Sequence, residues 1–278
     1  MMHGRTSPLL RLCIPVILAL SLVMLFASSA FASTKAQRAL IGPSHYYAAA
    51  GDSLAFGYQP NLNWADGYSN YFYSNLQSHG EQDYDNYACP GETSATFING
   101  GCPYSYLKKA FYFGAQLPAV VNAIKAHPGQ VSPVTLDIGA NDLLPDINTS
   151  NCTVSANWTS DLAKVDANLT GTILPQLVAA LTVNGRVTGD ILLMGYYDPY
   201  QNTCPNSVQY IEQINQHLQN DAGSSATFVD VFDAFGGATT PNPNLCNYTW
   251  ICSSFHDIHA RNAGYSVMTS AFEQAAGY

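Results

Sequence analysis

Short apolar runs alternate with amphipathic stretches along residues 40–278. Five apolar runs indicate buried strands: "YYAAAG" (46–51), "YDNYAC" (84–89), "VTLDIG" (134–139), "DILLMGY" (190–196) and "TFVDVF" (227–232). Amphipathic patterns predict helices over 66–78, 115–127, 158–182, 207–222 and 262–276, with a kink at Pro175. This alternation predicts an α/β fold in which helices wrap a parallel sheet. Ligands bind such a sheet at the carboxyl ends of its strands, where we expect the functional residues.

The N-terminal residues follow another pattern. Arg5 and Arg11 precede the apolar run "IPVILALSLVMLF", and small residues follow it as far as Ala32. This order predicts a secretory signal peptide over 1–32, then an N-terminal extension over 33–44 and one domain over 45–278. The alternative is an uncleaved anchor, but the apolar run is short for a membrane span. We therefore expect a secreted protein with no stable membrane span in the mature chain.

Charge and cysteine content narrow the classes of function. The predicted mature chain has 8 basic and 19 acidic residues, a net charge of −11, and no basic stripe that would indicate nucleic-acid binding. An even number of cysteines in an exported chain indicates disulfides, and sequence proximity favours three pairs. These are Cys89–Cys102, Cys152–Cys204 and Cys246–Cys252. No zinc-type spacing of cysteine and histidine occurs, so we expect no metal.

The first predicted strand ends at a serine. Gly51-Asp52-Ser53-Leu54 places Ser53 at the corner between this strand and the next element. Helix N-terminal amides beside its hydroxyl would stabilise an anion, but a serine here is equally well a helix N-cap. The sequence has no Gly-x-Ser-x-Gly elbow at this corner, which argues against the α/β-hydrolase fold.

Further polar corners follow the second and third predicted strands. Gly91, in "CPGET", has a backbone N–H that an oxyanion can approach closely, although the segment also fits a plain turn. Asn141, in "GAND", would supply a side-chain N–H to the same oxyanion. Its neighbour Asp142 is better suited to fixing the loop. "FHDIHARNAGY" then brings His259 just before the last predicted helix.

These blocks, in this order, resemble the SGNH (GDSL) hydrolase superfamily over most of residues 45–277. The resemblance implies a flavodoxin-like, three-layer α/β/α sandwich around a mostly five-stranded parallel sheet. It implies that Ser53 attacks an ester carbonyl and that His259 moves the proton. Backbone N–H groups of Ser53 and Gly91, with the Asn141 side chain, would hold the oxyanion.

The resemblance also bears on cofactors and substrates. It implies no cofactor, and we expect a monomer acting on a small-molecule, lipid or carbohydrate ester. A carbohydrate O-acetyl esterase, an acyltransferase on the same machinery and a non-catalytic binding protein remain alternatives. Trp64 is the aromatic residue that we expect to line the substrate pocket, whereas Tyr68 and Phe72 fit the buried face of a helix.

The sequence departs from the family pattern at the acid. The acid usually stands three residues before the histidine, where this chain has His256, and the aspartate follows at Asp257. One step along an extended segment reverses the direction of a side chain. Three outcomes stay open: a compact loop lets Asp257 reach His259, a backbone carbonyl orients His259, or Asp257 caps the last helix or pairs with Arg261. Metal binding by His256 and His259 lacks a third clear ligand.

Overall fold

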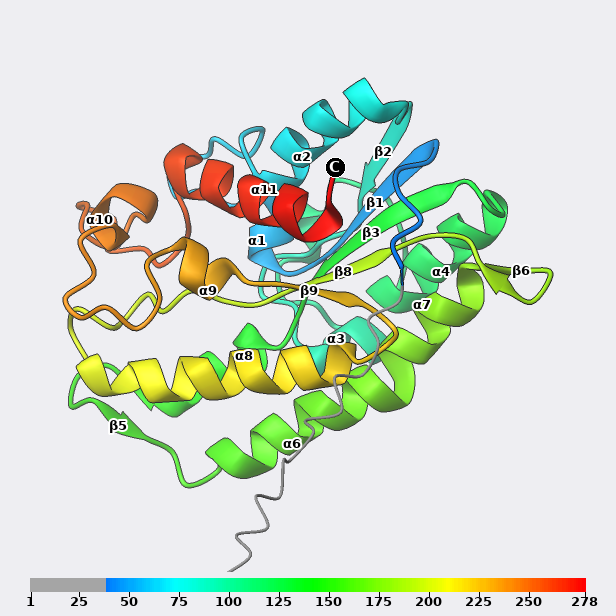
Figure 1. Ribbon diagram of the computed structural model, residues 1–278. Coiled ribbons are helices and arrows are strands. Elements are labelled where there is room, and N and C mark those ends of the chain that lie inside the picture. The colour runs from blue at the N-terminus through cyan, green and yellow to red at the C-terminus, as the bar shows by residue number, and fades with distance from the viewer. Residues whose placement is uncertain (1–38) are drawn as a thin grey trace, which may run out of the picture. The chain divides into compact units, whose positions relative to one another are not determined.

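The computed structural model describes residues 39–278 (Figure 1). The predicted signal peptide and residues 33–38 of the predicted extension lie outside them. A five-stranded sheet has the order β2-β1-β3-β8-β9, and every neighbouring pair is parallel. In sequence order this is the 2-1-3-4-5 arrangement of flavodoxin-like folds, so the predicted fold class is confirmed. The strands are β1 (Tyr46–Gly51), β2 (Asp83–Asn86), β3 (Val131–Asp137), β8 (Ile191–Met194) and β9 (Thr227–Val229).

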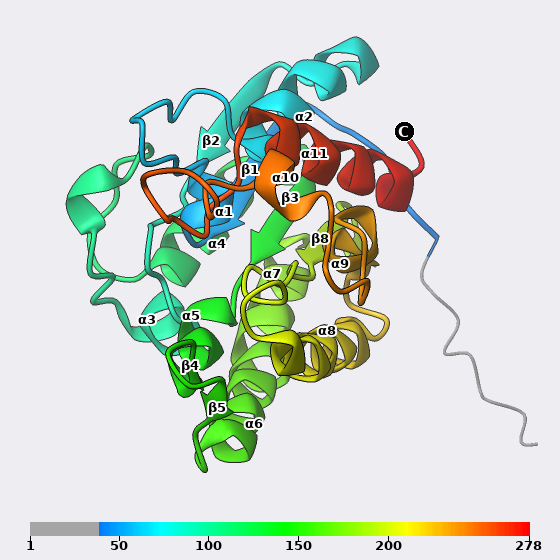
Figure 2. The same cartoon turned by 90° about the vertical axis from the view of Figure 1, so that its left-hand side faces the viewer.

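Helices cover both faces of the sheet (Figures 1 and 2). The pair α2 (Tyr68–Leu76) and α11 (Asn262–Ala276) covers one face. The other face carries α4 (Gln116–Ala126), α6 (Trp158–Asn168), α7 (Leu174–Ala180) and α8 (Val208–Ala222). Residues three and four apart along α8, namely Ile211, Ile214 and Leu218, are buried, as a helix with one apolar face requires. The helices therefore match the predicted ranges to within a few residues, and they make the α/β/α sandwich.

The long predicted helix is interrupted where the sequence placed a kink. A π-helical turn, Leu169–Ile173, joins α6 to α7, and Pro175 lies in the first turn of α7. Proline has no N–H to donate to the preceding turn, and a π turn is one way for a helix to absorb that loss.

Short elements connect these layers, and the sequence patterns indicated none of them except the helix that begins at the Ser53 corner. The helices are α1 (Ser53–Phe56), α3 (Ser94–Asn99), α5 (Ala140–Leu143), α9 (Val231–Ala234) and α10 (Leu245–Tyr248). Two hairpins pair β4 (Ile147–Asn148) with β5 (Thr153–Val154) and β6 (Thr182–Val183) with β7 (Arg186–Val187). Single 3₁₀ turns occupy Gln77–His79, Ser105–Leu107, Leu144–Asp146 and Pro205–Ser207. Each spans too few residues for a hydrophobic period to be recognisable.

Three disulfides fasten the loops, and their pairing is the one that sequence proximity favours. Cys89 bonds Cys102, Cys152 bonds Cys204, and Cys246 bonds Cys252. Residues 41 and 42 of the predicted extension are also held, because their backbone N–H groups donate to the Asp190 carboxylate. Among the described residues no helix is long and apolar enough to cross a membrane.

Candidate active site

The corner after β1 is set by Gly51. Its φ is +135°, and a Cβ there would lie 2.2 Å from the carbonyl oxygen of Asp137, so no side chain fits. The chain then turns into α1, whose N-cap is Asp52, with its carboxylate accepting the Leu54 N–H at 2.9 Å. Ser53 is therefore not the N-cap of α1, and its hydroxyl is free for other partners.

Ser53, His259 and Asp257 form one hydrogen-bonded chain. His259 Nε2 lies 2.7 Å from Ser53 Oγ, and His259 Nδ1 lies 2.7 Å from Asp257 Oδ1. Because an ionised carboxylate only accepts, the ring proton sits on Nδ1 and Nε2 accepts the serine hydroxyl. Burial alone would raise the pKa of Asp257, but the ring and backbone hydrogen bonds from His259 outweigh it, and its pKa lies below the usual range.

A compact turn lets Asp257 reach the imidazole from a position next to the family's usual one. His256 is exposed and takes a left-handed conformation, with φ +47°. Asp257 Oδ1 then accepts the backbone N–H of His259, two residues on, at 2.8 Å, which is the geometry of an Asx turn. Arg261 does not pair with Asp257; its Nε donates to the Thr249 carbonyl, and α11 has no side-chain cap.

The backbone around His259 is tied down on both sides. Trp250 N–H donates to the His259 carbonyl at 3.0 Å, and Arg261 N–H donates to the Tyr248 carbonyl at 2.8 Å. Tyr248 and Trp250 lie in the segment that the Cys246–Cys252 disulfide closes, so the disulfide supports the partners of these two hydrogen bonds. At the start of α11, a Cβ on Gly264 would lie 2.2 Å from the Tyr248 carbonyl oxygen, so only glycine permits this close packing.

Three possible oxyanion donors face the same pocket as Ser53. Within residues 39–278 the backbone N–H groups of Ser53 and Gly91 donate to no acceptor. Asn141 Nδ2 donates to the Glu92 carbonyl at 3.0 Å, which fixes the amide and leaves its second N–H available. Gly91 has φ +80°, and a Cβ there would lie 2.7 Å from Pro103 Cγ. The neighbouring Asp142 binds Ser94 through both oxygens and so fixes this loop to α3, in line with the sequence expectation.

Beneath Ser53 lies a buried pair of carboxyl groups that the sequence reasoning missed. Asp137 ends β3, and its Oδ2 accepts the backbone N–H groups of Asp52 and Ala55, both at 3.2 Å. Tyr68 donates to its other oxygen at 2.6 Å. Burial raises the pKa of both Asp52 and Asp137, and the nearby Asp52 carboxylate raises the Asp137 pKa further, well above its ordinary value. A carboxylate inside the apolar run "VTLDIG" was the signal that could have identified it.

A pocket of about 540 Å³ opens at these residues. It lies at the carboxyl ends of β1, β2, β3 and β8, the edge of the sheet that Figure 2 faces, and α8 closes its floor. Aliphatic side chains line the floor: Leu144, Pro199, Ile211 and Ile214. Aromatic side chains line the mouth: Tyr58, Trp64, Tyr104 and Tyr106. Trp64 is thus in the pocket, whereas Tyr68 and Phe72 are buried in α2.

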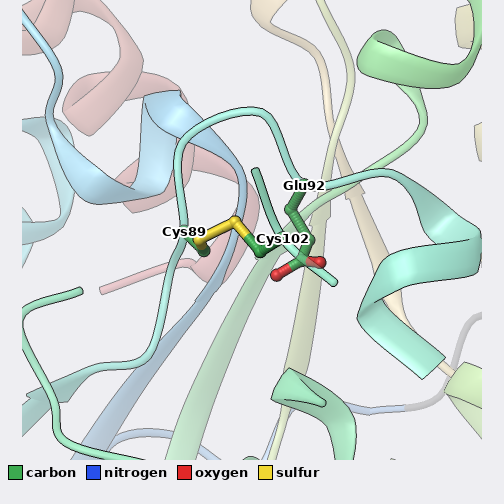
Figure 3. Close-up of side chains that lie close together, drawn as sticks. All are labelled: Cys89, Glu92 and Cys102. Carbon is green, nitrogen blue, oxygen red and sulfur yellow. A yellow bond between two sulfur atoms is a disulfide. The ribbon is translucent and has the colours of Figure 1, made fainter. Parts of the chain in front are cut away.

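One group of described side chains has the proximity of metal ligands. Atoms of Cys89, Glu92 and Cys102 lie within 4.8 Å of one another (Figure 3). The two sulfurs are bonded to each other, so neither is a thiolate that could bind a metal. Burial raises the pKa of Glu92, and Gln116 donates to its Oε2 at 2.9 Å. These contacts describe a structural carboxyl group beside the disulfide.

Solved structures of hydrolases share this architecture. The lipase Lip_vut3 from a goat rumen metagenome has a TM-score of 0.60 at 17% identity, over 84% of this chain and 98% of that one. An extracellular lipase from Streptomyces rimosus has a TM-score of 0.54 at 17% identity, over 84% and 100%. A variant of Axe2, an acetyl-xylooligosaccharide esterase from Geobacillus, has a TM-score of 0.56 at 19% identity, over 85% and 96%. At these identities the likeness concerns the fold.

The family of this chain is identified from its sequence. No curated protein matches it. Residues 49–267, however, match the model of the GDSL-like lipase/acylhydrolase family, a span that contains Ser53, Gly91, Asn141 and His259. The chain therefore belongs to the GDSL-like lipase/acylhydrolase family and is an ester hydrolase.

Proposed function

We propose that the chain cleaves carboxylic esters with Ser53 as nucleophile, His259 as general base and acid, and Asp257 as the group that orients His259. The observation that carries the proposal is the pair of 2.7 Å contacts, Ser53 to His259 and His259 to Asp257, at the wall of the 540 Å³ pocket. A nucleophile, a base within hydrogen-bond reach and a third group holding the base are the requirements of nucleophilic acyl transfer.

The reaction has two halves. Ser53 Oγ attacks the ester carbonyl carbon while His259 Nε2 takes the hydroxyl proton, and Asp257 stabilises the imidazolium that forms. The tetrahedral intermediate collapses, the C–O bond to the alcohol breaks, and His259 returns the proton to the leaving alkoxide. Water then attacks the acyl-serine by the same proton transfers and releases the acid.

The oxyanion is assigned to the N–H groups of Ser53 and Gly91 and to the Asn141 amide. Their location at one wall of the pocket and the free N–H groups support this assignment. Losing one such donor typically lowers turnover by about 10²–10³-fold. An Asn141→Ala variant would have to fall in this range, although it also removes the hydrogen bond to Glu92.

The pocket floor favours an acyl chain longer than acetyl. A volume near 540 Å³ is that of a site for a ligand of many heavy atoms, and an acetyl group would occupy a small part of it. Ile211 and Ile214 on α8 offer an apolar surface that water covers unless a hydrocarbon replaces it. We therefore place the acyl chain toward α8 and the alcohol toward the aromatic mouth.

Hydrolysis of p-nitrophenyl esters tests the proposal. Wild-type protein should hydrolyse the butyrate, and Ser53→Ala, which removes only a hydroxyl, should retain no hydrolysis above buffer. An active Ser53→Ala variant would end the serine mechanism. A series from acetate to palmitate should peak beyond acetate; a sharp preference for acetate would support a carbohydrate O-acetyl esterase instead. Ester product from an added alcohol in excess of free acid would indicate an acyltransferase.

We also propose that the chain acts outside the cytoplasm. Three disulfides support this location, because reducing compartments disfavour them. Fractionation of the producing cells tests it: the protein should be found in the culture medium, with its N-terminus near residue 33.

A further inference from the structure

Large apolar side chains are exposed mainly on three loops. Of those exposed in the described residues, only Leu40 and Ile41 lie elsewhere. The other members are Leu62, Tyr104, Tyr106, Phe111, Phe113 and Phe255, which we call the rim. Phe111 and Phe113 are the most exposed, at 84% and 86%. Scattered single exposures are normal on protein surfaces, but a cluster of this size on neighbouring loops indicates an interaction surface.

The three loops surround the mouth of the pocket. Residues 57–67 contribute Trp64 to the pocket, residues 100–114 contribute Tyr104, and residues 250–261 contribute His259. In Figure 2 all three loops lie on the same side of α1. Of the rim residues, Tyr104 and Tyr106 line the pocket themselves, and the other four lie on the loops that supply its residues.

Direct contacts hold the loops to one another. Lys109 Nζ donates to the Trp64 carbonyl at 2.7 Å, which ties the second loop to the first. Trp250 Nε1 donates to Gln59 Oε1 at 3.2 Å, which ties the third loop to the first. The rim side chains are therefore exposed on loops whose backbone is held by hydrogen bonds to one another. Loose loops do not explain the exposure.

The charge of the second loop, residues 100–114, indicates which kind of surface the rim would bind. Residues 100–114 contain Lys108 and Lys109 and no acidic residue, in a chain of net charge −9. Lys108 is half-buried, with its Nζ 3.6 Å from the centre of the half-buried Tyr112 ring, and the exposed Phe111 and Phe113 flank Tyr112 in the sequence. Exposed aromatic rings next to lysines are the combination that binds the boundary between lipid headgroups and acyl chains, most strongly where headgroups are anionic.

The ring geometry argues against a platform for sugars. A sugar stacks on a flat ring face, and two rings form one platform only if they are close to coplanar. Phe111 and Phe113 cross at 80°, and Tyr104 and Tyr106 cross at 69°. Phenylalanine also brings no hydroxyl or amide to bind the sugar hydroxyls.

We propose that the rim is a docking surface that seats the pocket mouth on a lipid surface with anionic headgroups. Phe111, Phe113 and Leu62 enter the boundary between headgroups and acyl chains, while Lys108 lies at the headgroups. An ester in that surface then enters the aromatic mouth directly. The benefit of docking rests on the proposed ester hydrolysis. The binding of the rim to a lipid surface does not require catalysis.

Vesicle binding by the Ser53→Ala protein tests docking separately from hydrolysis. This variant should sediment with phosphatidylcholine vesicles that contain phosphatidylglycerol, and less with phosphatidylcholine alone. Adding Phe111→Ser and Phe113→Ser should weaken binding by about tenfold or more, because burial of one phenylalanine corresponds to about that factor. The matched control is Leu40→Ser with Ile41→Ser, which removes exposed apolar side chains outside the rim and should leave binding unchanged.

Activity on a dissolved ester completes the test. With Ser53 restored, the Phe111→Ser, Phe113→Ser variant should hydrolyse p-nitrophenyl butyrate like wild type and lose activity on vesicle-borne ester. Docking is overturned if the Ser53→Ala protein binds no vesicles, if the control weakens binding equally, or if the two phenylalanines instead bind the protein to insoluble xylan. A lack of Ser53-dependent butyrate hydrolysis would contradict the proposed function and leave the vesicle result standing.

Discussion

Replacement of Asp257 by asparagine should be much milder than replacement by alanine. One oxygen, Asp257 Oδ1, accepts both the His259 backbone N–H at 2.8 Å and the ring Nδ1–H at 2.7 Å. Two converging donors direct the carbonyl oxygen of an asparagine to that position and keep its NH₂ group away. Asparagine therefore preserves the orientation and the tautomer of His259 and removes only the negative charge.

The magnitude follows from the charge and its exposure. Two unit charges about 4 Å apart interact by about 4 kcal/mol at an effective dielectric constant near 20. The side chains of His259 and Asp257 are 19% and 22% exposed, so solvent screens part of this attraction. A remainder of about 1.5–3 kcal/mol corresponds to a loss of about 10–100-fold in kcat for Asp257→Asn. Alanine also removes the acceptor, so the loss should approach the roughly 10⁴-fold seen when a triad histidine has the wrong tautomer.

The assay is kcat and KM for p-nitrophenyl butyrate with wild type and both variants. His256→Asn is the control, because the His256 side chain is exposed and asparagine tolerates its left-handed conformation, φ +47°, so kcat should stay unchanged. Equal losses for Asp257→Asn and Asp257→Ala would refute the shared-oxygen argument. Wild-type activity in both variants would mean that the backbone alone holds His259. Because the pKa of Asp257 lies below its usual range, its titration should not set the acid limb of the rate profile near neutral pH.

Other regions give further predictions. Burial raises the Glu81 pKa from 4.5 to about 8, so the native state holds this proton more tightly than the unfolded chain and loses stability as pH rises from about 4.5 to about 8; Glu81→Gln should flatten the melting temperature across this range in a calorimetric pH series. Gly91→Ala places a Cβ 2.7 Å from Pro103 Cγ at φ +80° and should lower kcat by about 10-fold or more, with little change in KM. Cys246→Ser with Cys252→Ser should lower kcat more than Cys152→Ser with Cys204→Ser, since only the former pair closes the segment bonded to His259.

The layers of this fold could be predicted because their cause is local and periodic. Buried parallel strands need continuous apolar runs, and covering helices need one apolar face, so both were recognisable in the sequence. The interruption of the long helix before Pro175 could be predicted because its cause is also local. Proline lacks the N–H that would bond to the preceding turn of the helix. Four of the five strands end before their predicted runs do. β2 ends at Asn86 and is exposed over most of its length, because it lies at the edge of the sheet, so the expectation of a buried strand was wrong there.

The position of the acid could not be settled from spacing. Whether Asp257 reaches His259 depends on the left-handed conformation of His256, which alternation along an extended chain does not describe. The sequence held no distinct signal for this contact, since almost every aspartate has a backbone N–H two residues on, and only the turn conformation makes an Asx turn of it. The pocket floor was a different case: Ile211 and Ile214 are ordinary buried positions of an amphipathic helix, and only the packing of α8 across the strand ends brings them to the site.

The buried carboxyl pair beneath Ser53 affects the charge close to the proposed oxyanion. Two ionised carboxylates beneath Ser53 would oppose the negative charge that acyl transfer develops on the substrate oxygen. Burial and the Asp52 charge raise the pKa of Asp137, which favours its protonated form and limits the negative charge of the pair. That charge is engaged by the Leu54 N–H and by the Tyr196 hydroxyl, at 2.9 and 3.1 Å. The same pair fixes the backbone of the serine corner, since Asp137 accepts the N–H groups of Asp52 and Ala55 on either side of Ser53. The carboxyl group that ends β3 thus fixes the backbone around the proposed nucleophile, Ser53.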